Sequence, residues 1–456
     1  MLFRLSALHR LADGDVIGFF VDIVQLAGSV PCDGYNGGCF LKSMLLAAAA
    51  VMAAVPAAAE TVVVTAARML DVEKGTIVQR PAITVTDGRI TAIGGTAPVD
   101  ARRIDLGDVT LVPGLIDMHV HLDSTPLYGG YTGLQFTDNF WAVQGVGNAA
   151  AMLRAGFTTV RNVGSENFND VAYKQAIDEG LMIGPRIVPA AHALSATGGH
   201  CDSTFFPPSF NQRGKAVGDT PDELRTHVRQ QRKYGAEVIK VCATGGVFSH
   251  NTEPGQQQLS EAELRAIADE AHQWGLKTAA HAHGAAGIKA AIRAGIDTIE
   301  HASLIDDEGI RLAKERGAYL SMDIYNTEYT QAEGAKNGVL EDNLRKDREV
   351  AQIQRDNFRK ANAAGVKMIF GTDAGVMPHK DAGKQFRVMV QYGMTPLQAI
   401  RAATVTAAEA LGRSKDVGAI AVGRYGDMVA VAGDPLADVT LLERPVAVIK
   451  GGTRVD

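Results

Sequence analysis

Residues 115–122 read LIDMHVHL, an alternation of side chains that has the period of a β-strand. Asp117, His119 and His121 are two residues apart and therefore lie on one face of this strand, while apolar residues occupy the other face. Two histidines with this spacing can both reach one metal ion. A His-x-His pair is weak support by itself, because a single buried histidine is more often a hydrogen-bonded core residue.

Seven further strand patterns follow along the chain, and helical patterns such as Glu261–Trp274 and Ala285–Ala294 lie between them. The eight expected strands are Leu115–Leu122, Thr158–Gly164, Arg186–Ala191, Val238–Thr244, Lys277–His283, Thr298–Ser303, Tyr319–Tyr325 and Met368–Ala374. Strands that alternate with helices form a parallel sheet, and eight strand–helix units close as a barrel. We therefore predict an α/β protein with a (β/α)8 TIM barrel over residues 113–417.

Both ends of this region change to short strands and tight turns. The expected strands here are Thr61–Ala66, Ile83–Asp87, Arg89–Gly94, Gly426–Val431 and Pro445–Lys450, with a hairpin signal at Asp87-Gly88. We predict that residues 60–112 and 418–456 combine into one small β-sandwich domain, built from both ends of the chain.

The N-terminal residues 1–59 have the pattern of a targeting segment. Met44–Val55 is a short apolar run, and an Ala-x-Ala pattern follows at Ala57 and Ala59. We predict a signal peptide cleaved after Ala59, export to the periplasm or medium, and no stable membrane anchor after cleavage; a buried helix is the alternative. Residues 1–40 are expected to be a translation-start artefact preceding a natural start near Leu41.

Composition excludes several classes of protein. A chain of 456 residues with 46% hydrophobic and 21% charged residues is neither disordered nor fibrous. Lys and Arg number 45 against 51 Asp and Glu, which gives a net charge of −6, and this argues against a nucleic-acid partner. Gly198-Gly199 and Gly245-Gly246 lack the spacing of phosphate-binding loops. Cleavage after Ala59 would leave two cysteines, Cys201 and Cys242, and their pairing stays open.

Polar side chains gather at the ends of the expected strands, where barrel chemistry occurs. Besides the first-strand pair they are Lys240, His281, His283, His301 and Asp373. Burial should depress the pKa of Lys240, which lies among β-branched residues. Each residue has an ordinary alternative, such as a salt-bridge partner for Lys240 or a helix cap for Asp373, but so many coincidences at strand ends favour a catalytic site.

At this point the sequence resembles a known family. The stretch Pro113–His121 is similar to the first-strand signature of the amidohydrolase superfamily, and the resemblance covers nearly all of residues 60–456. Thr197–His200, Lys240–Gly246 and His281–Gly284 resemble its Xaa-Pro dipeptidase-like and imidazolonepropionase-like branch. That branch includes carboxypeptidases that release Lys or Arg from dipeptides and N-acyl derivatives, and amidohydrolases that act on ochratoxin.

The resemblance implies a set of metal ligands. His119, His121 and Asp373 would hold one metal ion, and His281 and His301 would hold the second. Lys240, carboxylated by carbon dioxide, would bridge both ions. Imidazole and carboxylate ligands suit zinc, with manganese or cobalt as alternatives. His283 shares a face with His281 and is expected to contact substrate, and the resemblance also implies a homo-oligomer.

The implied activity is hydrolysis of an amide bond by a hydroxide that bridges the two metals. Asp373 would accept the proton of the hydroxide and deliver it to the leaving amine. His200 and Tyr325 are candidates for binding substrate oxygens, with a loop histidine and a core tyrosine as the plain alternatives. We expect a small-molecule amide or dipeptide substrate and release of a C-terminal amino acid.

Two other functions compete with this one. A cyclic-amide hydrolase or deaminase of the same superfamily is the first, although many such deaminases have no bridging lysine, so Lys240 argues against them. A non-catalytic binding relative is the second, and it would be expected to have lost ligands, whereas none is missing here.

Overall fold

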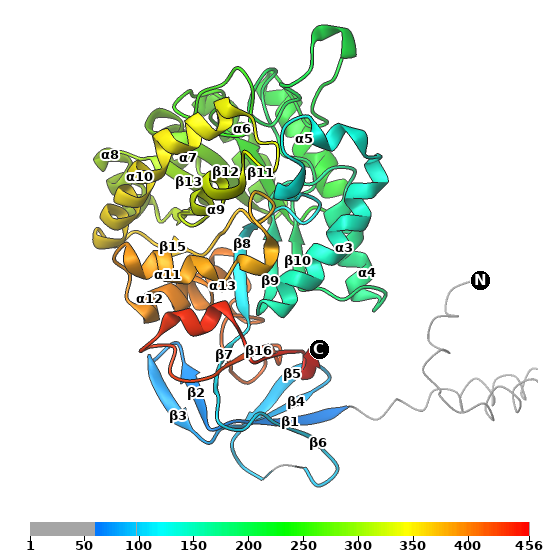
Figure 1. Ribbon diagram of the computed structural model, residues 1–456, viewed down its shortest axis with the longest axis vertical. Coiled ribbons are helices and arrows are strands. Elements are labelled where there is room, and N and C mark those ends of the chain that lie inside the picture. The colour runs from blue at the N-terminus through cyan, green and yellow to red at the C-terminus, as the bar shows by residue number, and fades with distance from the viewer. Residues whose placement is uncertain (1–59, 97, 456) are drawn as a thin grey trace, which may run out of the picture. The chain divides into compact units, whose positions relative to one another are not determined.

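The computed structural model describes residues 60–96 and 98–455 (Figure 1). The predicted signal peptide, its cleavage site after Ala59 and residues 1–40 lie outside the described residues. No helix of the described part is long and apolar enough to cross a membrane.

The central region consists of parallel strands that alternate with helices. The strands are β8 (Leu115–Val120), β9 (Phe157–Asn162), β10 (Arg186–Pro189), β11 (Val238–Cys242), β12 (Lys277–Gly284), β13 (Thr298–Leu304), β14 (Tyr319–Ser321) and β15 (Met368–Ile369). They form a three-stranded sheet in the order β10-β9-β8 and a five-stranded sheet in the order β11-β12-β13-β14-β15. Every neighbouring pair in both sheets is parallel.

The helices of this region carry apolar residues on the faces that they bury. They are α3 (Asp138–Arg154), α4 (Asn169–Asp178), α5 (Pro221–Lys233), α6 (Glu261–Gln273), α7 (Ala285–Ala294), α8 (Asp307–Arg316), α9 (Asn326–Glu333), α10 (Glu341–Ala363), α11 (Lys384–Gln391), α12 (Pro396–Ala402) and α13 (Val405–Ala410). Short 3-10 turns are η2 (Pro126–Tyr128), η3 (Thr132–Gln135), η4 (Pro208–Phe210), η5 (His379–Asp381) and η6 (Val439–Glu443). The expected helix Ala285–Ala294 is confirmed, and Glu261–Trp274 is one residue shorter.

Backbone hydrogen bonds connect the two parallel sheets. The amide of Met118 in β8 donates to the carbonyl of Phe370, just after β15, at 2.9 Å, and the amide of Asp373 donates to the carbonyl of His119 at 2.8 Å. On the other side, the amide of Leu194, which follows β10, donates to the carbonyl of Lys240 in β11 at 2.9 Å. The carboxyl ends of β8, β11 and β15 are thereby held next to their neighbours.

Several expected strands end later than the observed ones, and two of them, β14 and β15, do so by four residues or more. β14 ends at Ser321 instead of Tyr325, because the amide of Ile324 donates to the carbonyl of Met322 in a tight turn. β15 ends at Ile369 instead of Ala374, and Asp373 has a φ of 58°, which lies outside the range of extended backbone. Both departures occur next to polar side chains of the candidate site.

The β-rich part contains strands from both ends of the described chain. One sheet has the order β5-β4-β1-β6, and the other has the order β18-β17-β16-β7-β2-β3. Their bounds are β1 (Thr61–Thr65), β2 (Arg68–Asp71), β3 (Thr76–Gln79), β4 (Ala82–Thr86), β5 (Arg89–Ile93), β6 (Arg102–Asp105), β7 (Thr110–Pro113), β16 (Met428–Val431), β17 (Ala447–Lys450) and β18 (Thr453–Val455). Figure 1 shows the N-terminal strands next to β16, with which β7 pairs in antiparallel register. The exact domain boundaries stay a prediction.

The expected hairpin at Asp87-Gly88 is confirmed. Thr86 of β4 pairs with Arg89 of β5, and the two residues between them have φ values of 49° and 77°. Positive φ at both central positions is what a two-residue hairpin turn requires, and Asp-Gly supplies it at little cost.

Candidate metal centre

The predicted ligand residues lie at the carboxyl ends of parallel strands. His119 is in β8 and His121 follows it directly, Lys240 is in β11, His281 and His283 are in β12, His301 is in β13, and Asp373 follows β15. All of them are buried except His121, whose side chain is 29% exposed. Residues from strands that are up to 250 positions apart in sequence therefore meet at one end of the sheets.

A first group of donor atoms surrounds Asp373. His119 Nε2 lies 3.3 Å from Asp373 Oδ1, and His121 Nε2 lies 3.4 Å from the same oxygen. Ligand atoms of His119, His301 and Asp373 all lie within 4.8 Å of one another, a separation that one metal ion can span. The predicted set of His119, His121 and Asp373 is thus brought together in space.

A second group overlaps the first. Ligand atoms of His281, His283 and His301 lie within 4.8 Å of one another. The rings of His283 and His301 stack at 4.6 Å between centroids, with 9° between their planes. His301 belongs to both groups, so the two sets of donors are adjacent. His283 therefore has a ligand's position as well as the predicted role in contacting substrate.

Hydrogen bonds to one ring nitrogen orient most of these histidines. Nδ1 of His119 lies 3.0 Å from Glu300 Oε2, and Nδ1 of His301 lies 2.9 Å from Asp323 Oδ1. Nδ1 of His121 lies 3.0 Å from the carbonyl oxygen of Gly164. Acceptors at Nδ1 fix the tautomer that leaves Nε2 with a free lone pair, which is how metal-binding histidines are usually held.

His281 and His283 are oriented in different ways. Nε2 of His281 lies 3.2 Å from the carbonyl oxygen of Gly245, which leaves Nδ1 as the nitrogen available to a metal. Nδ1 of His283 lies 2.8 Å from the hydroxyl of Ser303, which leaves Nε2. Each histidine thus keeps one nitrogen for a ligand.

Backbone strain marks the same site. His301 has a φ of 68° and Asp373 has a φ of 58°, both in the left-handed region that such residues seldom adopt. Non-glycine residues persist in this region only where the surrounding structure holds them, and such positions cluster at functional sites. The amide of Asp373 is held by the carbonyl of His119 at 2.8 Å.

Lys240 lies among these groups without a hydrogen bond to its side chain from any described residue. The residue is 3% exposed, and burial lowers the pKa of its ammonium group to about 8, against the attraction of Glu300 and Asp373. Its charge in turn lowers the pKa of His200, His281 and His283. A lowered pKa raises the fraction of the amine that is neutral near pH 7, and the neutral amine is the nucleophilic form.

The pKa shifts of His281, His283 and Asp373 also suit metal ligands. Burial, followed by neighbouring histidines, keeps the pKa values of His281 and His283 well below their usual range. Burial raises the pKa of Asp373, but His119 and His121 outweigh it and hold that pKa well below its usual range. Neutral imidazoles and an ionised carboxylate are the protonation states in which these side chains bind metals.

The pKa of His119 shifts in the opposite direction to those of His281 and His283. Burial and the Lys240 ammonium lower its pKa, but the carboxylates of Asp373 and Glu300 prevail, so the pKa is raised. A divalent cation would take the place of this proton on the Nε2 side, because both are held by the same carboxylates.

The structure places His200 and Tyr325, two of the three predicted substrate-binding residues, differently. The ring of His200 stacks on that of His281 at 4.0 Å, with 16° between the planes. Tyr325 is buried at the start of α9, and its described partners are Gln385 and Lys384 instead of the histidines. Its role in binding substrate stays a prediction.

Sequence reasoning missed the residues that hold the ligands. Arg161 is 1% exposed and donates to Glu300 at 2.7 Å and to the carbonyl of Met118 at 2.6 Å. Glu300 is fully buried, and although burial raises its pKa, Arg161 and His119 hold that pKa well below the usual range. The available signal was a charged residue within each apolar strand, at Arg161 and Glu300.

Comparison with known proteins defines the class. Residues 110–455 match the Amidohydrolase family, and the chain belongs to this family. The protein is therefore a hydrolase that acts on C–N bonds.

Three relatives place the chain more closely within that family. It is 31% identical over 409 residues to the ochratoxinase of Aspergillus niger, covering 83% of each chain, and the crystal structure of A. niger ochratoxinase has a TM-score of 0.78. The crystal structure of a Xaa-Pro dipeptidase with bound methionine in the active site has a TM-score of 0.81 and 34% identity, covering 87% of this chain and 100% of that one. An imidazolonepropionase of Streptococcus pyogenes is 24% identical over 405 residues, covering 78% of this chain and 85% of the relative. The branch that the sequence motifs suggested is confirmed.

Proposed function

We propose that this protein is a binuclear metal-dependent amidohydrolase that releases a C-terminal amino acid from dipeptides or N-acyl amino acids. The observation that carries the proposal is the pair of overlapping donor groups, with His301 in both and the buried Lys240 close by. We further infer that the eight parallel strands form a (β/α)8 barrel, a reading supported by the hydrogen bonds that join β8 to the segment after β15 and β11 to the segment after β10.

The donor set fits two divalent ions. His119, His121 and Asp373 would hold one, His281 and His301 the other, and a carboxylated Lys240 would bridge them. The described cysteines form a disulfide with each other, so the donors are imidazole and carboxylate, which favours zinc. Such ions would polarise the scissile carbonyl and supply a nucleophilic water at neutral pH.

In this mechanism Asp373 would carry the proton. Its Oδ1 faces the two first-strand histidines, and its carboxylate is ionised, so it can accept the proton that the attacking water loses. The same carboxyl group can then protonate the leaving nitrogen, which must depart as an amine. With His281 as the metal ligand, His283 would contact substrate through Nε2, the nitrogen that the bond from Nδ1 to Ser303 leaves free.

His200 can serve as a neutral hydrogen-bond donor to the substrate oxygen. Burial, with the nearby charges of His301 and Lys240, lowers its pKa to about 3, so that its ring is neutral at pH 7. A neutral imidazole donates from one nitrogen only, and its Nδ1 is paired with the hydroxyl of Ser249 at 2.9 Å. The Ser249 hydroxyl also lies within donating distance of the Gly246 carbonyl, at 3.3 Å. When Ser249 donates to His200 instead, Nε2–H remains for the substrate.

The relatives support the substrate class. One similar enzyme is an ochratoxinase, and the structure of another, a Xaa-Pro dipeptidase, contains the free amino acid methionine in its active site. Both are consistent with an amide whose leaving group is an amino acid. The similarity to imidazolonepropionase keeps cyclic-amide hydrolysis as the competing activity.

The test is a substrate screen with zinc-loaded protein. The panel contains dipeptides ending in Pro, Met, Lys or Arg, N-acyl amino acids, ochratoxin A and cyclic amides, and the readout is release of a free amino acid. Turnover of dipeptides or N-acyl amino acids is expected. Turnover of cyclic amides alone, or release of ammonia, would instead establish the competing activity.

We also propose that the protein is exported and forms a homo-oligomer. The signal pattern before Glu60 supports export, and a disulfide in the described part is consistent with an oxidising compartment. Cell fractionation should find the mature chain outside the cytoplasm with an N-terminus at Glu60, and size-exclusion chromatography should give more than one chain. A cytoplasmic protein that retains Met44 would contradict export.

A further inference from the structure

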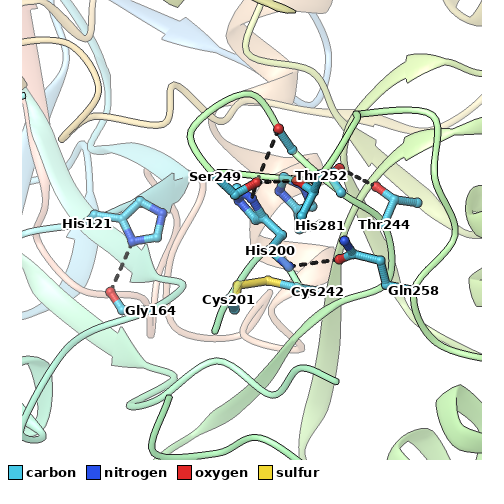
Figure 2. The surroundings of a disulfide bond; sticks show 12 residues. His121, Gly164, His200, Cys201, Cys242, Thr244, Ser249, Thr252, Gln258 and His281 are labelled. Carbon is cyan, nitrogen blue, oxygen red and sulfur yellow. Dashed lines mark hydrogen bonds between the residues drawn. A yellow bond between two sulfur atoms is a disulfide. The ribbon is translucent and has the colours of Figure 1, made fainter. Parts of the chain in front are cut away.

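A disulfide bond lies beside the candidate metal centre. Cys201 and Cys242, whose pairing the sequence left open, are joined with their Cα atoms 6.0 Å apart (Figure 2). Cys242 is the last residue of β11, two residues after Lys240, and Cys201 directly follows His200. The bond therefore ties the segment that carries His200 to the strand that carries the proposed bridging lysine.

Non-covalent contacts hold the ring of His200 in one place. Its Nδ1 pairs with the hydroxyl of Ser249 at 2.9 Å, and its amide donates to Gln258 Oε1 at 2.8 Å, as Figure 2 shows. The ring of His200 also stacks on the ring of His281. A Cβ at Gly246 would lie 2.3 Å from Cε1 of His200, so only glycine at that position leaves room for the ring.

The loop that contacts His200 is anchored independently. Lys346, which is 1% exposed in α10, donates to the carbonyl of Ser249 at 2.8 Å, and Asn343 in the same helix donates to the carbonyl of Val247 at 2.6 Å. The loop on this side of the His200 ring is therefore tied to a long helix and does not need the disulfide.

The segment that bears His200 contains little regular secondary structure. Between Pro189, which ends β10, and Pro221, which begins α5, the only regular element among the described residues is the short turn η4. The carboxylate of Asp202 holds this segment locally, accepting from the amides of Gly198 and Gly214. A long irregular connection has high conformational entropy, and a covalent link to a buried strand removes much of it.

We propose that the Cys201–Cys242 disulfide is a positioning element of the active site, which holds His200 against His281 so that its free nitrogen faces the substrate. The proposal rests on the proposed function for its catalytic consequence, but its structural part stands apart from it. Reduction by a phosphine balances simply: the disulfide takes up two electrons and two protons as two thiols, and the phosphine takes an oxygen atom from water as phosphine oxide. The side chains proposed to bind the metals take no part in this step.

The first experiment compares oxidised and reduced wild-type protein. Complete reduction, checked by titrating two thiols per chain, should lower kcat/KM by about 10- to 100-fold, the effect expected of a displaced catalytic group. Metal content should not change, and reoxidation should restore the rate, which a merely unfolded protein would not do. A phosphine is used because dithiols bind zinc. The double variant Cys201→Ser/Cys242→Ala should have the reduced rate and be insensitive to phosphine. Unchanged kcat/KM after complete reduction would overturn the proposal.

The second experiment asks whether the bond acts through His200. In His200→Asn, reduction should have little further effect on kcat/KM, because coupled positions are not additive. A loss of the same factor in His200→Asn as in wild type would overturn the proposal.

A third readout is independent of activity. In metal-free protein, hydrogen exchange at the amides of His200 and Cys201 should speed up on reduction while exchange in β12 stays the same. If oxidised wild type hydrolyses nothing in the substrate screen, the proposed function fails, and the exchange measurement still decides whether the disulfide holds His200. No change in exchange at His200 would overturn the structural part.

Discussion

At the scale of single residues, the centre depends on charges that are buried only because each has a partner. Arg161 and Glu300 pair at 2.7 Å with both side chains removed from water, and Glu300 uses its second oxygen for His119. A buried pair of this kind contributes little to stability by itself but is costly to break, because the remaining charge has no partner. Its value here is orientation: Nε2 of His119 faces Asp373.

Asp373 is the residue whose replacement separates chemistry from binding. Asp373→Asn keeps the size of the side chain but cannot accept the proton of the attacking water. We expect kcat to fall by roughly 10²–10⁴ with a much smaller change in KM, the range for loss of a positioned acid–base group. Steady-state kinetics with metal analysis measures this, and His283→Asn is the comparison, since it should change KM more than metal content. Near-normal kcat in Asp373→Asn with both metals bound would assign the proton to another group.

His379 predicts a pH dependence of stability. Burial lowers its pKa from 6.5 to about 4, and its Nε2 donates to the carbonyl of His121. Between these pH values the unfolded chain binds a proton that the folded protein does not, so the free energy of unfolding falls as the pH falls from 6.5 towards 4. For this residue the loss is about 3 kcal/mol. Urea unfolding of His379→Gln at pH 7 and pH 4 should show a decrease smaller than that of wild type by about this amount. Equal decreases would show that His379 is not buried as a neutral ring.

At the scale of elements, the loop after β11 is built around glycines that the site requires. Gly246→Ala would place a methyl group 2.3 Å from the His200 ring and displace it. We expect kcat/KM to fall by about 10- to 100-fold with metal content retained. Gly255→Ala is the matched control in the same loop, because its Cβ would meet only Leu304 at 3.9 Å. Similar rates in the two variants would contradict the placement of His200.

The elements differ in how well the sequence predicts them. β8 and β11 could be predicted because an apolar face repeats along each of them, and β9, β12 and β13 because they alternate with helical patterns. β2, β3, β6, β7 and β18 were missed, since each has four residues or fewer and a segment this short shows little alternation. The ends of β14 and β15 could not be predicted, because a turn at Met322 and the positive φ of Asp373 depend on tertiary contacts.

The residues of the candidate site also differ in how well the sequence predicts them. Ligand residues could be recognised because chemistry limits them to a few residue types at strand ends. Their partners could not: Asp323 and Ser303 are ordinary polar residues in the sequence, and only the fold brings them to His301 and His283. The same holds for the disulfide, which joins residues 41 positions apart.

At the scale of the whole described chain, contacts tie the β-rich part to the parallel strands. Arg186, the first residue of β10, donates to Asp427, next to β16, and its guanidinium lies 3.5 Å from the ring centroid of Tyr425. Asp427 also accepts from the amide of Gly451 at 2.7 Å. Two regions that are distant in sequence thus share one partly buried ion pair.

Asp427→Ala should destabilise the whole described unit. It removes the partner of Arg186, which is 23% exposed, and leaves the Gly451 amide without its acceptor. We expect a loss of about 2 kcal/mol in the free energy of unfolding, less than for a fully buried pair because Arg186 can still reach water. Denaturant unfolding measures it, and Asp427→Asn, which keeps an acceptor oxygen, should lose less. Two separate transitions in wild-type protein would show that the β-rich part and the parallel strands unfold independently.

Metal add-back tests most directly whether two metal ions act together with Lys240. Wild-type protein and Lys240→Ala are stripped with a chelator, zinc is added in steps in the presence of bicarbonate, and bound metal and amino-acid release are measured together. In wild type the rate should be absent without metal and should rise until two ions per chain are bound. Lys240→Ala should bind less metal and lose nearly all activity, and short carboxylic acids should restore part of it as substitute bridges. Full activity of the stripped wild type, or two bound ions and a wild-type rate in Lys240→Ala, would contradict the binuclear mechanism.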